Sequence, residues 1–189
     1  MDSKTKSFRK VVSEDLKECL ADALLQLIVS KPMEKITIDE LAEKAGVGRV
    51  TYFRAFHSKQ EVLTFKIVRL WNEYARKHDL KIHDRFDLEN ARAFFAFNLE
   101  IQNVLQVLYS AGLQQVLYDA FCQILLSFEK EVDLLHRFRE KYYAYGLYGL
   151  LDEWILNGFQ PGPEQMADML IQIVHSPYVI QPEENKQKK

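Results

Sequence analysis

The sequence has few cysteines and lacks the long apolar segments of signal peptides and membrane spans. Its 189 residues include only two cysteines, Cys19 and Cys122, which are far apart and stand among apolar residues on helical patterns. We expect buried, reduced thiols and neither a disulfide framework nor a thiolate metal site. No apolar signal-peptide core is found, and no apolar run approaches the roughly 20 residues that a membrane span requires. The expectation is a soluble, cytoplasmic protein without membrane contact.

Groupings of side chains that are typical of enzymes are also missing. The five histidines lie on different expected segments, and none has a cysteine or carboxylate at metal-ligand spacing. No serine lies in a nucleophile elbow, and no glycine-rich stretch matches a phosphate loop. Asp152 and Glu153 are adjacent acids, but neighbours on a helix point apart and do not share a site. We expect no catalytic residue, no metal and no cofactor.

Strand patterns are almost absent, whereas apolar residues recur at three-and-four spacing along most of the chain. The fold class is therefore predicted to be all-α. A first helix is expected at about 13–29, where Lys31-Pro32 would end it. Later helices are expected from Lys59 through Trp71 and at about 88–102, 104–111, 113–135, 137–157 and 163–175, the last with Pro163 in its first turn.

The most informative stretch is residues 36–63, ITIDELAEKAGVGRVTYFRAFHSKQEVL. Thr37 and Glu40 have the spacing of a capping box, which predicts the start of a short helix. Gly46 follows that helix, where a sharp turn needs a residue that tolerates positive φ. The pattern predicts two short helices joined by a tight turn, as in a helix-turn-helix.

The second short helix is expected between Gly48 and Phe56. Its inward residues would be Tyr52 and Phe56, with Val47 just before the helix. An outward surface would be formed by Arg49, Val50, Thr51, Phe53 and Arg54. Ser58 and the glutamate three residues later form a second capping box, so a new helix should begin at Lys59.

This stretch resembles the DNA-binding region of the TetR family of bacterial transcription regulators. The run AEKAGVGRVTYFRAFHSKQEVL is close to the family pattern A-x-x-A-G-V-S-x-x-T-[LF]-Y-x-[HY]-F-x-[SN]-K-x-x-L. The likeness extends over about a third of the chain, from Leu16 to roughly Trp71. Gly48 replaces the common Ser, Phe53 the usual Tyr and Ala55 the frequent His. The last two changes remove polar groups that could contact phosphates.

The resemblance implies an N-terminal three-helix head with a helix-turn-helix, followed by a larger helical domain for ligand binding and dimerisation. We accordingly expect a flexible basic arm at 1–12, a DNA-binding domain at 13–71, a ligand-binding and dimerisation domain at 72–178 and a polar tail at 179–189. Residues 1–60 carry 11 Lys and Arg against 9 Asp and Glu, whereas the rest has 14 against 18. The basic arm could follow a phosphate backbone or enter a minor groove, or it could simply be solvated.

The implied function is regulation of transcription, by a ligand-responsive repressor that binds double-stranded DNA at a near-palindromic operator as a homodimer. Arg49 can donate two hydrogen bonds to guanine O6 and N7, and Val50 can meet a thymine methyl. The Thr51 hydroxyl can reach a base or a phosphate, or bond back to its own helix. The remaining expected contacts to DNA are those of Thr37, Gly48, Phe53, Arg54 and Lys59.

The segment 142–173 is apolar on more than one face, which favours a second role in assembly. By resemblance, its helices would pair with those of a second subunit as a four-helix bundle. The expected interface residues are Tyr148, Leu151, Trp154, Ile155, Met169 and Ile173. The first four could instead cover the subunit's own core.

Aromatic residues of the larger domain could line a cavity for a small apolar or aromatic ligand, or they could simply fill a core. Those singled out for a pocket are Phe94, Phe97, Tyr118 and Phe121. An alternative function also stays open, in which a protein of this fold acts mainly by docking to another protein and binds DNA weakly or without specificity. Arg49, Arg54, Lys59 and the basic arm favour DNA.

Overall fold

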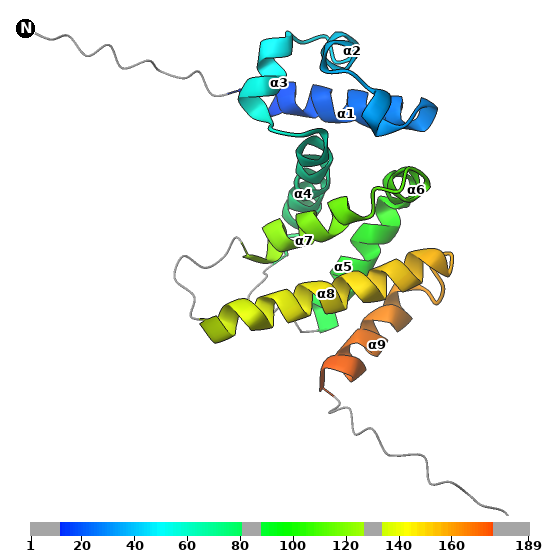
Figure 1. Cartoon of the computed structure of the whole chain (residues 1–189). Helices are drawn as coiled ribbons and strands as arrows, with labels where there is room; N and C mark the ends of the chain where they lie inside the picture. The colour runs from blue at the N-terminus through cyan, green and yellow to red at the C-terminus, as the bar shows by residue number, and fades with distance from the viewer. Residues whose placement is uncertain (1–11, 81–87, 127–133, 176–189) are drawn as a thin grey trace, which may run out of the picture.

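The computed structural model describes residues 12–80, 88–126 and 134–175, and within these ranges every regular element is a helix (Figure 1). The all-α prediction is confirmed. Apart from Val12, the expected basic arm at 1–12 lies outside the described residues, and so does the polar tail at 179–189.

Three helices form the N-terminal head: α1 (Glu14–Ser30), α2 (Ile38–Lys44) and α3 (Arg49–Ala55), with a short 3₁₀ turn, Met33–Lys35, between α1 and α2. The hydroxyl of Ser13 accepts a hydrogen bond from the backbone N–H of Leu16 and caps α1. The helix ends at Ser30, and Lys31 caps it just before the proline, as expected. The side chains at the centre of the head are fully or almost fully buried: Leu20, Leu24, Leu41 and Tyr52. Burial of these apolar surfaces is what holds such short helices in place.

Helix α4 (Lys59–Lys77) connects the head to the rest of the molecule and packs against both α1 and α7 (Figure 1). Its start is fixed by Ser58, whose hydroxyl accepts the backbone N–H of Glu61 at 3.0 Å, as the capping pattern predicts. Leu63 and Ile67 are buried near the head, and Trp71 is buried further along. One rigid helix therefore reaches from the head into the second domain.

The second domain contains α5 (Leu88–Glu100), α6 (Gln102–Ser110), α7 (Gln115–Leu126), α8 (Leu134–Leu156) and α9 (Pro163–His175). Helix α5 packs on α9, and α7 packs between α4 and α8. The expected helix at 113–135 is wrong at its end, because Leu134 and Leu135 belong to α8. The expected start of α9 at Pro163 is confirmed.

The core of this domain is built from aromatic rings. Phe95 and Phe159 contact the Trp154 ring edge-on, with centroid distances of 5.3 and 5.1 Å. The indole N–H of Trp154 donates to the carbonyl of Pro161 at 2.7 Å, so the buried polar atom has a partner. The expectation of buried thiols is wrong for Cys19, which is exposed, whereas Cys122 is partly buried and both are free.

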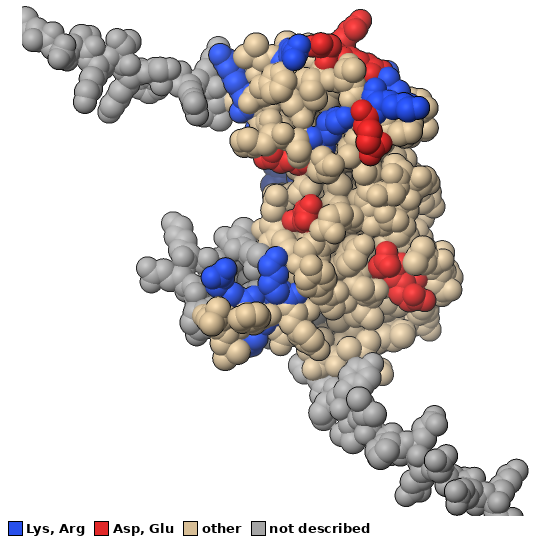
Figure 2. All heavy atoms as spheres, in the orientation of Figure 1, with Lys and Arg blue, Asp and Glu red and all other residues tan. Residues whose placement is uncertain are grey.

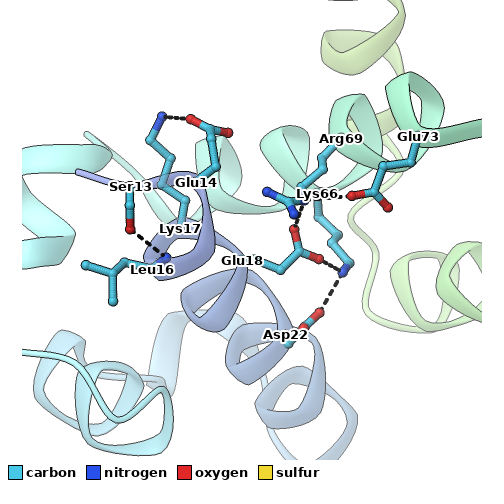
Figure 3. A network of polar contacts seen from close by, with 9 residues as sticks. All are labelled: Ser13, Glu14, Leu16, Lys17, Glu18, Asp22, Lys66, Arg69 and Glu73. Carbon is cyan, nitrogen blue, oxygen red and sulfur yellow. Dashed lines mark hydrogen bonds and ion pairs between the residues drawn. The ribbon is translucent and has the colours of Figure 1, made fainter. Parts of the chain in front are cut away.

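A cluster of ion pairs joins α1 to α4 (Figure 3). The ammonium of Lys66 lies between the carboxylates of Glu18 and Asp22, at 2.7 Å from the latter. Arg69 pairs with the same Glu18 and with Glu73. Partial burial acts to lower the pKa of Lys66, but hydrogen bonds to Asp22 and Glu18 outweigh it and raise that pKa. This cluster fixes the head on α4.

No described helix is long and apolar enough to cross a membrane.

Candidate nucleic-acid interface

The turn between α2 and α3 has the geometry that the sequence predicts. The Thr37 hydroxyl accepts the backbone N–H of Glu40 at 3.2 Å and caps α2. At the other end, Gly46 has φ of +65°, and the next residue, Val47, donates its N–H to the carbonyl of Ala42 at 3.0 Å. This is a Schellman ending, in which a left-handed residue satisfies the last carbonyls of the helix. The chain thereby turns sharply into α3.

The acidic half of the first capping box has an additional partner. The Glu40 carboxylate accepts a hydrogen bond of 2.6 Å from the ammonium of Lys31, at the end of α1. This hydrogen bond lowers the pKa of Glu40, and the backbone N–H of Thr37 contributes in the same direction. The pair therefore ties α2 to the end of α1, a link that the local pattern does not reveal.

Helix α3 presents its two faces as expected. Tyr52 and Phe56 are 3% and 4% exposed and hold the helix on the head, whereas Val50 and Phe53 are 60% and 58% exposed. Gly48 takes the N-cap position without a side-chain hydrogen bond. The outward face thus projects two apolar side chains beyond the surface of the head, together with the exposed cations of Arg49 and Arg54.

The guanidinium of Arg49 has two contacts on the surface of the head. Its Nη1 atom lies 3.2 Å from Oδ1 of Asp39 on α2, and its Cζ atom stands 5.4 Å from the centre of the Phe53 ring. Phe53 is itself packed edge-on against buried Tyr52, with ring centres 5.3 Å apart. Sequence reasoning missed Asp39, because the pair joins two helices across a turn and no local spacing marks it.

The other expected contacts to DNA lie around this face. Thr37 is exposed and Thr51 half-buried, and no hydrogen bond is found between the Thr51 hydroxyl and any other described residue. The ammonium of Lys59 donates to the carbonyls of Met33 and Ile36, the latter at 2.8 Å. One of its three donors remains for a phosphate. Lys59 is therefore first a structural residue that closes the 3₁₀ turn.

Basic and acidic side chains are intermixed over the head (Figure 2). The head and the start of α4, at 12–60, contain 7 Lys and Arg against 8 Asp and Glu. The positive balance of the first 60 residues therefore comes from the segment 1–11, with its four basic residues and one acid. Long-range attraction to DNA would depend on that segment.

The expected dimerisation residues divide into two groups. Leu151, Trp154 and Ile155 are 0%, 1% and 8% exposed, so they lie in the subunit's own core and offer a second subunit almost nothing to contact. The expectation is corrected for these three, in favour of the alternative. Tyr148 is half-buried, whereas Met169 and Ile173 on α9 are exposed.

A different set of apolar residues on α8 is exposed to solvent: Leu134, Leu135, Phe138, Tyr142, Tyr145 and Leu156. Four of them, from Leu135 to Tyr145, fall at three-and-four steps along the helix, and Leu156 lies about three turns further on the same face. These five residues are hereafter the α8 stripe. Sequence reasoning missed this stripe because the part of α8 from Tyr142 onward is apolar on more than one face, and periodicity alone does not tell an inner face from an outer one.

The expected ligand pocket is largely filled. Phe94, Phe97 and Phe121 line an apolar cavity of about 50 Å³, which Trp71 of α4 also lines. Small-molecule pockets have volumes of about 300–1,000 Å³, so this space is too small in the present conformation. Tyr118 does not line this cavity. Its ring stacks on that of Tyr145, with the ring centres 4.2 Å apart. Over the described ranges, no three His, Cys or acidic side chains come together as metal ligands.

Two known sequence families match the chain. One, described as bacterial regulatory proteins, tetR family, matches residues 20–64, which contain most of α1, the helix-turn-helix and the start of α4. The other, described as a transcriptional regulator C-terminal region, matches residues 93–176. Together they span roughly two thirds of the chain. No curated protein shows significant similarity to it.

Proposed function

Because this chain belongs to the TetR family of bacterial transcription regulators, we propose that it is a repressor that binds a near-palindromic operator as a homodimer and is released by a small ligand. The observation that carries the proposal is the outward face of α3. It places Arg49, Val50 and Phe53 clear of the head, where they can enter a major groove. Arg54, Thr37 and the free donor of Lys59 are the proposed phosphate contacts.

Arg49 is the proposed base-reading residue. A guanidinium donates two parallel hydrogen bonds to O6 and N7 of guanine, which discriminates against other bases by about 1–3 kcal/mol. Val50 beside it supplies an apolar contact for a thymine methyl. The basic arm at 1–12 is proposed to follow the phosphate backbone, because it holds the positive charge that the described head lacks.

A dimer is proposed because the α8 stripe is otherwise unaccounted for. Phe138, Tyr142 and Tyr145 are 67%, 76% and 60% exposed, far more than aromatic residues of a monomer's surface require. Gly146 and Gly149 lie on the same side, are exposed, and have open space where a side chain would be. In an antiparallel pair of α8 helices, aromatic rings of one copy can fit against these glycines of the other.

The same interface would include Met169 and Ile173 of α9, which are 45% and 37% exposed. Asp152 shares the stripe, but its carboxylate already accepts a hydrogen bond of 2.6 Å from the hydroxyl of Tyr109. This carboxylate oxygen therefore keeps a hydrogen-bond partner when the stripe is covered, and the half-buried Asp152 stands near the end of the stripe, away from Tyr142. Two heads related by a two-fold axis would then read half-sites about 10 base pairs apart or at a multiple of that distance.

Release by a ligand is proposed to act through α4. The small cavity between Phe94, Phe97 and Phe121 also touches Trp71, on the helix that carries the head. A small apolar or aromatic molecule that enlarged the cavity would displace that helix and change the distance between the two heads. Such a ligand would bind more tightly to the state of the dimer whose head-to-head distance does not fit DNA. It would therefore shift the population towards that state. Unchanged operator affinity across saturating candidate ligands would count against this part.

The test is selection of random duplex DNA by the purified protein, followed by binding of the enriched sequence. We expect a near-palindrome whose affinity drops by about five- to 150-fold for each half-site in Arg49→Ala. Arg76→Ala is the matched control, because Arg76 is an exposed arginine at the far end of α4, away from α3. No enriched sequence at low salt, or equal loss in both variants, would overturn the proposal.

A second function is kept because of one observation. The outward face of α3 is more apolar than a DNA-reading face requires, since Phe53 and Val50 are largely exposed. Such a face could dock another protein, with weak or no specific binding of DNA. Binding that is indifferent to Arg49 would favour this alternative.

A further inference from the structure

The guanidinium of Arg49 contacts one residue from each helix of the helix-turn-helix. Asp39 of α2 approaches the Nη1 atom, at 3.2 Å from one carboxylate oxygen and 3.4 Å from the other. Phe53 of α3 lies one helical turn after Arg49, and its ring faces the cation at 5.4 Å. The side chains of Arg49 and Asp39 are 60% and 71% exposed, so the pair stands at the surface that would face DNA.

The contact with Asp39 leaves most of the arginine's donors available. A guanidinium has five N–H donors, and Asp39 occupies only the Nη1 end. The edge formed by Nε and Nη2 stays free, and it is one of the two edges that can donate two parallel hydrogen bonds to guanine. A carboxylate on one end and an aromatic ring below therefore limit the rotation of Arg49 without blocking its reading edge.

We propose that Asp39 is a specificity-determining residue, which together with the Phe53 ring positions Arg49 to read one guanine in each half-site. The inference rests on the proposed function, in which Arg49 contacts a base. An arginine that is held before binding loses less conformational freedom when it binds, but only where the base it meets matches the pose in which it is held. Asp39 thus favours the matched base over the others.

The charge of Asp39 has the opposite effect on binding as a whole. A carboxylate at the DNA-facing surface repels phosphates and pairs with a cation that could otherwise neutralise one. Removing the charge should therefore raise affinity for DNA of arbitrary sequence while lowering the preference for the matched base. A residue with only a structural role would not move the two quantities in opposite directions.

The experiment uses Asp39→Asn, which keeps the size of the side chain and removes its charge. Affinities are measured for the enriched duplex, for the three duplexes altered at the base pair that Arg49→Ala identifies, and for unrelated DNA. We expect the preference for the matched base to fall roughly two- to fivefold, the range that an exposed ion pair supports. Affinity for unrelated DNA at low salt should rise.

Two further variants separate positioning from charge. Glu43→Gln removes an exposed acid four residues along α2, so it should raise affinity for unrelated DNA and leave the base preference unchanged. Phe53→Leu removes the ring and should lower the preference, whereas Phe53→Tyr keeps the ring and should preserve it. In the Arg49→Ala background, Asp39→Asn should no longer alter preference at that base pair.

The outcomes distinguish this inference from the proposed function. If the protein enriches a sequence in an Arg49-dependent way but Asp39→Asn keeps the full base preference, the positioning role is overturned and the regulator stands. Equal effects of Asp39→Asn and Glu43→Gln on every duplex would also overturn it, because charge alone would then explain both. If no sequence is enriched by the unaltered protein, the proposed function and this inference fail together.

Discussion

The outward face of α3 and the α8 stripe both expose large apolar side chains, yet their surroundings differ. On α3, Phe53 and Val50 stand among the charged groups of Arg49, Arg54 and Asp39. On α8, the exposed apolar residues follow one another along a single face, from Leu135 through Tyr145. The exposed cations of Arg137, Arg139 and Lys141 are on the same turns of α8, but their helical spacing puts them beside this face. Apolar contact mixed with charge suits a groove lined by phosphates, whereas an apolar face fits another copy of itself. Exposure alone would not have separated the two surfaces.

The largest expected effect is the loss of the dimer when the α8 stripe is disrupted. Tyr142→Glu would bury an unpaired carboxylate in the proposed interface, so we expect monomers at micromolar concentration. Operator affinity should fall by about a hundredfold or more, because the second head would no longer be held near its half-site. Sedimentation and DNA binding measure the two effects.

Val29→Glu is the matched control for that variant. Val29 is 70% exposed on the last turn of α1 and lies outside the stripe. The same apolar-to-acid change there should leave a dimer. If Tyr142→Glu is still dimeric, the stripe is not the interface and Tyr142 requires another explanation.

Salt should separate the two surfaces next. Binding to DNA should weaken steeply with salt, whereas dimerisation through an apolar stripe should not. Deleting residues 2–10 removes four basic residues and one acid. If each of the four basic residues neutralises a phosphate, the slope of log affinity against log salt should become shallower by up to about 3 to 4.

The control for this deletion is removal of residues 181–189, which also contain three lysines. That truncation should leave the slope unchanged, because those residues lie at the far end of the chain from the head. An unchanged slope after deletion of the arm would show that the arm is merely solvated, which is the alternative that the sequence leaves open.

The ion-pair cluster between α1 and α4 should have a smaller effect, on the stability of the fold. Lys66→Met removes a mostly buried cation from between Glu18 and Asp22, since the Lys66 side chain is 11% exposed. Glu18, at 22% exposed, would keep only Arg69 as a partner, and the half-exposed Asp22 would lose its pair. We expect the free energy of unfolding to fall by about 2 kcal/mol in denaturant titrations. Operator affinity should fall too, because the head would be held less firmly on α4, while dimerisation should not change.

Lys77→Met is the matched control for Lys66→Met. Lys77 pairs with Glu100 at 3.8 Å, and both side chains are more than half exposed. Such a pair contributes at most about 1 kcal/mol, so stability should hardly change. Equal losses in the two variants would contradict the special role given to the α1–α4 cluster.

The parts of the fold that the sequence predicts are those fixed within a few residues. Thr37 and Ser58 cap helices through bonds to backbone groups three residues away, and Gly46 ends α2 through its positive φ. These signals are local, so they can be read without knowing the fold. They also fix the candidate site to the extent that α3 is placed with Arg49 outward.

What could not be predicted depends on contacts between distant segments. Asp39 meets Arg49 only because the turn folds α2 against α3, and no periodicity records that meeting. Buried residues of α8 such as Trp154 were expected at an interface because the sequence shows only that Trp154 and Tyr142 are both large and aromatic. The packing of α8 on its neighbours decides that Trp154 is buried and Tyr142 exposed. Local pattern gives a helix its type, and tertiary packing chooses its inner face.

The smallest expected effect concerns acid and should be confined to the head. The ammonium of Lys31 donates to Glu40 and lowers the pKa of that carboxyl below its ordinary 4.5. A group whose pKa is lower in the folded state stabilises the fold above its ordinary pKa and loses that contribution as the pH falls through the folded value. Relative to Glu40→Gln, the unaltered protein should therefore be slightly more stable above about pH 5, and the difference should shrink as the pH falls below the ordinary pKa of 4.5 and through the lowered folded value.

This prediction is checked by the difference in free energy of unfolding between the two proteins, measured from pH 3 to pH 7. Glu43→Gln is the control, because Glu43 is an exposed acid on the same helix as Glu40 but has no contact with Lys31. Dimerisation should follow the same pH profile in all three proteins, since Glu40 lies in the head and the α8 stripe does not include it. A Glu40→Gln difference that does not shrink at all as the pH is lowered would mean that the carboxylate's charge is not what links α2 to α1, and that the loss comes from packing around the side chain.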